Sequence, residues 1–335
     1  MRYYSFIFIL FISLYGLVQA SAQNTIKIPP MPNSEVWKDT KGIPINAHGG
    51  GILLHMGTYY WFGEIKKGKT WLVPDQQWEA YRVPAGGVGC YSSKDFIHWK
   101  FQGVVLKAVI GNPSHDLDTS KVIERPKVIY NNRTKKFVMW MHVDANDYSY
   151  SQAGLAVSDK PAGPYKYLGS VKPNGQMSRD MTLFKDDDNR AYLIYASEFN
   201  KTMHVCLLND NYLSPTATYT RITSAQDREA PALFKYNHKY YLITSGCTGW
   251  SPNQATYATA DSLLGEWKQM GDPCIGADAE STFNSQSTFV LPLSGYPNMF
   301  LFMADRWNKT NLPDSRYIWL PIKMVDKKPV IEWIK

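Results

Sequence analysis

The chain has 335 residues, and its 36 Lys and Arg side chains against 29 Asp and Glu side chains give it a formal net charge of +7. The positive charges form only short clusters such as Lys66-Lys67-Gly68-Lys69, which excludes a nucleic-acid-binding track and indicates a mildly basic surface. Phosphate-binding loops and zinc-ligand spacings are absent from the sequence, so we expect no cofactor and no metal ion.

The chain opens with the pattern of a secretory signal peptide. Arg2 precedes an apolar run at residues 6–18, and Ala20-Ser21-Ala22 stands before Gln23. The run is too short for a membrane-spanning helix. No cysteine follows the cleavage point, so we expect no lipid anchor there. We therefore predict a cleaved leader at residues 1–22, no membrane insertion, and a periplasmic or secreted protein.

Five related segments follow the leader. Helical periodicity is scarce, and each segment instead holds two short strands joined by a turn, then a loop and a third strand. The segments cover residues 49–99, 127–159, 182–208, 232–267 and 287–322. A repeat of roughly 50–75 residues with three or four strands is typical of a β-propeller. We predict an all-β, five-bladed β-propeller that occupies residues 23–335 as one domain, and we expect a monomer.

Aromatic side chains make up 14% of the residues, which favours an aromatic β core or a surface that stacks on carbohydrate. The four cysteines, Cys90, Cys206, Cys247 and Cys274, allow three disulfide connectivities in an oxidising compartment. The sequence does not choose among these, and buried free thiols are an equal alternative.

Acidic residues recur beside arginines where strands begin. The three junctions are Glu124-Arg125-Pro126, Arg179-Asp180-Met181 and Asp227-Arg228-Glu229. The first strand of each propeller blade lines the axis, so these carboxylates are expected to converge at one end of the fold. The alternative is a set of structural Arg–carboxylate pairs, although such pairs need not fall at the same point in every repeat.

These features together resemble glycoside hydrolase family 43, whose members are five-bladed propellers with an axial active site. The stretch Tyr91-Ser92-Ser93-Lys94-Asp95-Phe96-Ile97-His98-Trp99 is similar to an element repeated in that family. Further segments are similar to its exo-β-1,3-galactanase branch, namely 45–51, 59–64, 124–127, 178–181, 228–231 and 284–287. The resemblance covers nearly the whole mature chain.

The resemblance implies a role for two of the carboxylates. Glu229 corresponds to the proton donor, and Asp180 to the acid that orients the donor and raises its pKa by like-charge repulsion. Arg179 and Arg228 would lower the pKa of Glu229 again if their positive charges pointed toward it. The general base, an Asp on the first blade in most of the family, falls at Asn46-Ala47-His48, where no carboxylate is present.

The galactanase branch points to Gln286 for activation of water. A neutral amide is a very poor base, so Gln286 could only orient water or act as an imidic-acid tautomer. Either role requires a hydrogen-bonding neighbour, for which we expect Glu124. Two alternatives stay open: Glu124 is itself the base, or Gln286 only satisfies backbone groups at a blade edge.

Six further residues are candidate substrate contacts. Glu64 ends a strand and could bind sugar hydroxyls or be an ordinary surface acid, and His48 could line the funnel, replace the lost acid or be a core histidine. The other four lie in loops after inner strands, where substrate contact and simple loop packing are equal alternatives: Tyr148, Glu198, Thr248 and Trp250.

The resemblance implies an exported, inverting exo-β-1,3-galactanase that releases galactose from the β-1,3-galactan backbone of arabinogalactan. An α-L-arabinofuranosidase or β-xylosidase of the same family is the first alternative, and the missing first-blade Asp disfavours it. A non-catalytic carbohydrate-binding propeller is the second. We expect a polysaccharide or oligosaccharide to be the partner and no nucleic acid.

Overall fold

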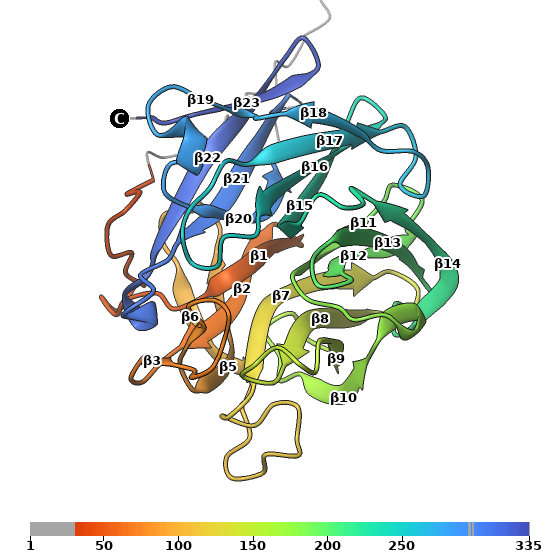
Figure 1. Ribbon diagram of the computed structural model, residues 1–335. Coiled ribbons are helices and arrows are strands. Elements are labelled where there is room, and N and C mark those ends of the chain that lie inside the picture. The colour runs from red at the N-terminus through yellow and green to blue at the C-terminus, as the bar shows by residue number, and fades with distance from the viewer. Residues whose placement is uncertain (1–30, 294–295, 297, 335) are drawn as a thin grey trace, which may run out of the picture.

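A computed structural model describes residues 31–293, 296 and 298–334. Five β-sheets surround a central axis, with β1, β7, β11, β15 and β20 nearest to it (Figure 1). The five-bladed propeller predicted from the repeats is therefore confirmed. The predicted leader at residues 1–22 lies outside the described residues. No helix in the described part of the chain is long and apolar enough to cross a lipid bilayer.

The strands follow one another from the axis to the rim in the first four blades. The first blade contains β1 (His48–His55), β2 (Thr58–Lys66), β5 (Ala85–Ser93) and β6 (Lys100–Leu106). The second contains β7 (Val122–Asn131), β8 (Lys136–Asp144), β9 (Gln152–Ser158) and β10 (Lys166–Val171). The third contains β11 (Met181–Lys185), β12 (Ala191–Ser197), β13 (Thr202–Leu208) and β14 (Pro215–Ile222). The fourth contains β15 (Arg228–Tyr236), β16 (Lys239–Gly246), β17 (Thr256–Ala260) and β18 (Lys268–Gly271).

The fifth blade has an additional outer strand. It contains β20 (Gln286–Pro292), β21 (Met299–Arg306), β22 (Arg316–Val325) and β23 (Lys328–Glu332), and β19 (Cys274–Ile275) pairs in parallel with β23. A separate hairpin of β3 (Trp71–Leu72) and β4 (Tyr81–Arg82) is inserted in the first blade. In the described part of the chain, three short 3-10 helices occupy loops: η1 (Pro173–Gly175), η2 (Ala279–Ser281) and η3 (Leu312–Asp314).

The core consists of five apolar clusters, one at each seam between neighbouring blades. The strands alternate between their two faces, and the apolar side chains of each face pack against the next blade. At the seam between the second and third blades, for example, Trp140 packs with Leu193 and Tyr195, and all three are fully buried. The ring of seams holds the blades at fixed angles around the axis.

Four of the five innermost strands carry a β-bulge near their start. The register shifts between His48 and Gly51 in β1, between Glu124 and Lys127 in β7, between Glu229 and Ala232 in β15, and between Ser287 and Phe289 in β20. A bulge turns one side chain away from the regular alternation of the strand. The candidate residues Glu124, Glu229 and Gln286 lie at or next to these bulges.

The segment before the first strand closes the ring between the fifth and first blades. Trp37 packs its ring 6.0 Å from that of Trp61 in the first blade and 4.8 Å from that of Trp319 in the fifth. The Asn33 side chain accepts a hydrogen bond from the Trp319 backbone N–H and donates one to its carbonyl. Within the residues that the structure describes, side-chain packing therefore closes the propeller.

The cysteines lie in separate blades and form no disulfide. Cys90, Cys206 and Cys274 are buried free thiols, and Cys247 is an exposed one. Of the two alternatives left open by the sequence, free thiols are the arrangement observed in this structure.

Replacing Trp37 tests the closure of the ring. Trp37→Ala removes a buried indole from the seam, so we expect the free energy of unfolding to fall by about 3–5 kcal/mol. Urea unfolding measures the change, and Val36→Ala, an adjacent substitution at a 44% exposed side chain, is the control. A loss no larger than that of the control would mean that the seam is stable without this segment.

Candidate active site

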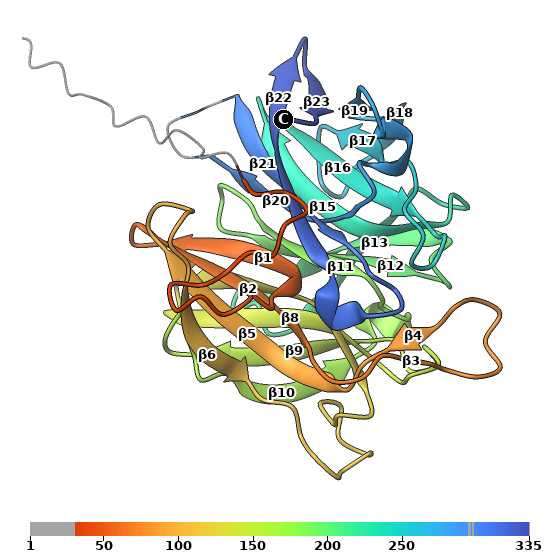
Figure 2. The ribbon, with the colours of Figure 1, turned by 90° about the vertical axis from the view of Figure 1, so that its left-hand side faces the viewer.

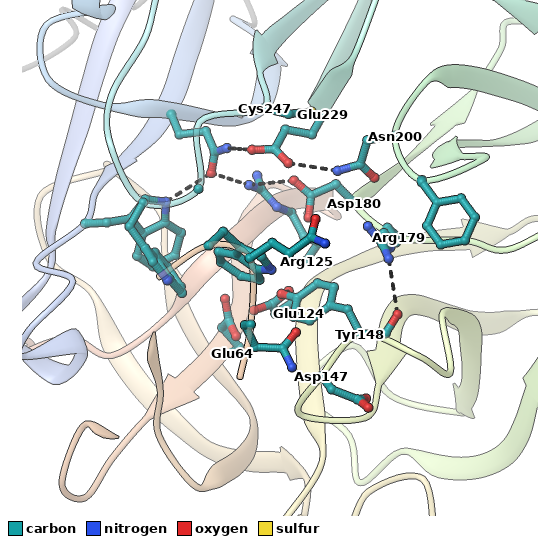
Figure 3. A pocket seen from close by; sticks show the side chains of 18 of the residues that line it. Glu64, Glu124, Arg125, Asp147, Tyr148, Arg179, Asp180, Asn200, Glu229 and Cys247 are labelled. Carbon is teal, nitrogen blue, oxygen red and sulfur yellow. Dashed lines mark hydrogen bonds and ion pairs between the residues drawn. The ribbon is translucent and has the colours of Figure 1, made fainter. Parts of the chain in front are cut away.

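The candidate site is a cavity of about 600 Å³ at the axis, and all five blades contribute to it. Its walls contain the residues drawn in Figure 3. Glu229, Asp180 and Asn200 lie along one side of that view, and Glu64, Glu124 and Tyr148 lie along the other (Figure 3). The sequence-predicted carboxylates therefore do converge at one end of the propeller.

Glu229 projects from the bulge of β15 and is held by two amides. Gln286 donates from Nε2 to Oε1 over 2.9 Å, and Asn200 donates from Nδ2 to Oε2 over 3.1 Å. Burial, followed by the negative charge of Asp180, raises the pKa of Glu229 to about 8. Glu229 is therefore protonated at neutral pH and is able to act as a general acid.

Asp180 precedes β11 and makes an ion pair and a hydrogen bond at Oδ2. The Arg125 guanidinium lies 2.9 Å away, and the backbone N–H of Ala230 lies 3.0 Å away. The neighbouring arginines bind other groups: Arg179, which also lines the cavity, donates to Ser151 and Tyr148, and Arg228 donates to Thr244. The cation that partly offsets the effect of Asp180 on the pKa of Glu229 is thus Arg125, for which the sequence alone indicated no such role.

The Gln286 amide makes four hydrogen bonds. Oε1 accepts from Arg125 over 2.6 Å and from Trp307 over 3.0 Å, while Nε2 donates to Glu229 and to Ser245. These contacts use both acceptor positions and both donor hydrogens of the amide. The expected hydrogen bond between Gln286 and Glu124 is not formed, because the bulge of β20 directs the amide to the side of the cavity that holds the acid.

Glu124 lies on the other side of the cavity and belongs to a buried chain of charges. Tyr148 donates its hydroxyl to Oε2 over 2.5 Å, and Lys66 Nζ lies 3.9 Å from Oε1. His142 places Nδ1 3.3 Å from Glu124 and Nε2 2.8 Å from Asp144. Burial alone would raise the pKa of Glu124, but His142 and Lys66 outweigh burial and hold it well below its usual value. Glu124 is therefore an ionised carboxylate.

Glu64 reaches the cavity from β2 and occupies space beside the innermost strand. A Cβ atom at Gly49, which has a φ of +58°, would lie 2.9 Å from Glu64 Oε1. Lys66 donates to the other oxygen over 2.9 Å, and burial raises the pKa of Glu64 to about 7. The Glu64 carboxylate of β2 thus occupies the space that a side chain at Gly49 of β1 would enter. This is the blade that lacks the expected Asp.

His48 does not line the cavity. It is 1% exposed, stacks on Tyr317 at 4.9 Å and has Nδ1 3.4 Å from Asp305. Asp305 also accepts the Gly49 N–H over 2.5 Å. His48 is therefore a core histidine that braces the bulge of β1 against the fifth blade.

Two of the four loop candidates line the cavity and two do not. Tyr148 and Trp250 contribute to its wall. Glu198 instead binds its own blade, accepting from Arg221 over 2.6 and 2.8 Å, and Thr248 donates to the carbonyl of Ser251. Positive φ at Glu198 (53°) places it within a tight turn, which directs it toward Arg221.

Several wall residues were not predicted. They are Arg125, Arg179, Asn200, Phe199, Trp307, Cys247, Gly249, Asp147 and the loop residues Asp75, Gln76, Gln77 and Trp78. Trp307 follows the end of β21 as Trp250 follows the end of β16, so the same sequence signal could have found it. The loop between β3 and β4 carries no pattern that distinguishes it from an ordinary surface hairpin.

Glu124, His142 and Asp180 bring three potential metal-binding atoms within 4.8 Å of one another. Cations of the protein already pair with this group, because Asp180 binds Arg125 and Glu124 lies beside Lys66. His142 faces carboxylates with both ring nitrogens, and these contacts raise its pKa to about 9 against the effect of burial, so the ring is protonated. The donor set therefore fits ion pairing and does not fit a metal ion.

A protonated carboxyl on one wall and an ionised carboxylate on the other form the arrangement that glycosidic hydrolysis requires. A family model for glycosyl hydrolases of family 43 matches residues 55–291. The chain belongs to glycoside hydrolase family 43. Membership makes it a glycoside hydrolase and confirms the family predicted from the sequence.

Solved structures of family 43 members agree with this assignment. A β-1,3-galactosidase, BT3683, determined with galactodeoxynojirimycin, is 44% identical with a TM-score of 0.82, over 90% of this chain and 98% of that one. The exo-β-1,3-galactanase of Phanerochaete chrysosporium is 38% identical with a TM-score of 0.79, and the match covers 89% of this chain and 66% of that one. The exo-β-1,3-galactanase of Clostridium thermocellum is 37% identical with a TM-score of 0.77, and the match covers 90% of this chain and 64% of that one. No curated protein sequence matches the chain significantly.

The pH dependence of this family 43 site should follow the charge on Asp180. Activity is expected to fall as the pH rises through about 8, where Glu229 loses its proton. Asp180→Asn removes the repulsion and leaves Arg125 in place, so the pKa of Glu229 decreases and the alkaline limb of kcat/KM moves to lower pH. Asp187→Asn, at an exposed carboxylate in a turn, is the control. If the alkaline limb of kcat/KM stays at the wild-type pH in Asp180→Asn, Asp180 does not raise the pKa of Glu229.

His142 should stabilise the fold in a pH-dependent manner. Its pKa is about 9 in the folded state against 6.5 for a free histidine, so its contribution is complete below pH 6.5 and is lost as the pH rises through 9. His142→Gln is expected to cost on the order of 3 kcal/mol more at pH 6 than at pH 10. Urea unfolding at both values tests this, with exposed His238→Gln as the control. An equal cost at both pH values would contradict a buried imidazolium.

Proposed function

We propose that this family 43 enzyme is an inverting exo-β-1,3-galactanase that releases galactose from the β-1,3-galactan backbone of arabinogalactan. One observation carries the proposal. The innermost strand of the first blade presents no carboxylate to the cavity, and Gln286 of the fifth blade binds the proton donor Glu229 directly. Most of the family uses three acids, and this chain departs from that pattern. Its sequence is also 37–44% identical to those of β-1,3-galactosidases and exo-β-1,3-galactanases.

The acid half of the reaction follows from the contacts of Glu229. As the bond from the anomeric carbon to the leaving oxygen breaks, Glu229 transfers its proton to that oxygen and becomes a carboxylate. Gln286 and Asn200 donate hydrogen bonds to the two carboxyl oxygens and stabilise the charge that forms. Arg125 neutralises Asp180 in part, so that Glu229 can both hold a proton and release it.

The attacking water is assigned to the opposite wall. An inverting enzyme needs a gap of roughly 6.5–9.5 Å between its two functional groups, and water enters from the face away from the acid. Gln286 lies 2.9 Å from the acid and has no free lone pair, whereas Glu124 is ionised and faces the cavity. Water therefore passes its proton to Glu124, and Gln286 could serve as the base only after leaving Arg125 or Trp307.

Exo action is supported by the walls of the cavity, to which all five blades contribute. The mouth is narrowed further by residues 75–78 of the loop between β3 and β4. A cavity with walls on all sides accepts the end of a chain, whereas an open cleft accepts its middle. The export expected from residues 1–22 is part of the same proposal, since an extracellular polysaccharide would be met in the periplasm or outside the cell.

Hydrolysis of linear β-1,3-galactan tests this function. We expect galactose as the first product, with the α anomer appearing first in proton NMR, and Glu229→Gln should lower kcat by about 10²–10⁴-fold without changing the thermal midpoint. Glu280→Gln, at an acidic residue outside the cavity, is the control. Release of arabinose or xylose instead would favour the pentosidase alternative, and galactan binding without turnover would favour a binding propeller.

A further inference from the structure

The hairpin β3–β4 carries a loop, residues 73–80, that reaches the mouth of the cavity and is called the mouth loop below. Asp75, Gln76, Gln77 and Trp78 of this loop all line the cavity. The hairpin stands out from the first blade, on the side of the molecule where η3 also lies (Figure 2). A loop so far from the body of its blade needs contacts elsewhere to hold one conformation.

Two contacts fasten the mouth loop region to the fifth blade. Glu79 forms an ion pair with Lys309, and Thr70 accepts the Leu312 N–H over 2.9 Å. Both partners lie in the segment that follows Trp307, a residue of the cavity wall. The mouth loop therefore bridges two blades above the cavity.

Trp78 is fixed on three sides. Its ring lies edge-on to Tyr148 at 5.7 Å, and the Arg82 guanidinium lies 5.1 Å from the Trp78 ring and 4.4 Å from the Tyr148 ring. On the remaining side, a Cβ at Gly249 would lie 3.3 Å from Trp78 Cε3, so the loop after β16 passes directly against the indole. Trp78 thus spans the mouth from the second blade to the fourth and yet is 38% exposed.

The contact with Gly249 locates Trp78 relative to the chemistry. Glu229 pairs with Ser245 in the β15–β16 register, and Cys247 and Gly249 follow Ser245 into the cavity wall. The leaving group must lie beside the proton donor. Trp78 also contacts Tyr148 on the wall of Glu124, so it stands across the mouth between the two walls. A leaving group that extends from the cavity toward solvent passes this residue.

We propose that Trp78 is a specificity-determining residue that stacks on the sugar leaving group, the galactosyl unit on the reducing side of the cleaved bond. The inference rests on the proposed function and extends it to the substrate beyond the cleaved bond. The Arg82 guanidinium lies over the Trp78 indole, and the 38% exposure of the residue leaves surface that the apolar face of a galactosyl ring complements. Gln76 and Gln77 beside it supply donors and acceptors for the hydroxyl groups of that ring.

The test compares two substrates that differ only in the leaving group. β-1,3-Galactobiose loses a galactose, whereas β-D-galactosyl fluoride loses a single atom that cannot reach Trp78. For Trp78→Ala we expect the ratio of kcat/KM for galactobiose to that for the fluoride to fall about tenfold, chiefly through KM. Trp78→Phe should restore most of the ratio. Lys309→Met, which removes the ion pair to Glu79, should lower it to a smaller extent.

Phe101→Ala is the matched control, because Phe101 is 39% exposed on the outer strand β6 and lies outside the cavity wall. For Phe101→Ala, the ratio of kcat/KM for galactobiose to that for the fluoride should equal the wild-type ratio. An equal fall on both substrates for Trp78→Ala would indicate a structural role and overturn the proposal, as would an unchanged ratio. Cleavage of the fluoride but not of galactobiose by the wild-type enzyme would overturn the proposed function and this inference with it.

Discussion

The site depends on one buried cation at the propeller axis. Arg125 of the second blade binds Asp180 of the third and both Gln286 and the Ser287 carbonyl of the fifth, at 2.6–2.9 Å. Asp180 in turn accepts the Ala230 N–H beside Glu229 in the fourth blade. One guanidinium therefore sets the distances among groups from four blades, and its planar fork can make these bonds at the same time.

The same cation also affects the protonation state of the proton donor. Burial and the charge of Asp180 raise the pKa of Glu229, and the positive charge of Arg125 lowers it, so the guanidinium limits how strongly Glu229 holds its proton. On the other wall, Lys66 and protonated His142 keep Glu124 ionised. Two glutamates within one cavity thus have opposite charge states, because burial and a neighbouring carboxylate keep Glu229 protonated whereas cations keep Glu124 ionised.

The fold supplies this arrangement through two separable features. Apolar seams between blades orient the innermost strands, and the bulges in those strands turn polar side chains into the cavity. The first blade departs from the pattern: β1 has Gly49 at its bulge, and Glu64 of the next strand occupies the space. The long insertion that follows β2 then supplies the mouth loop, so this blade contributes more to the entrance than to the floor.

The five-bladed fold and the acidic wall were predictable from sequence because both rest on local signals repeated along the chain. Strand alternation, turn residues and the acidic junctions at Glu124, Asp180 and Glu229 recur at comparable points of each repeat. The sequence did not predict which side chains meet across the axis. Gln286 binds Glu229, whereas the sequence led us to expect a bond to Glu124. Asp180 pairs with Arg125 and with neither Arg179 nor Arg228. Glu198 and Thr248 point away from the cavity. These choices depend on bulges and on packing between blades far apart in the chain, so only the tertiary structure decided them.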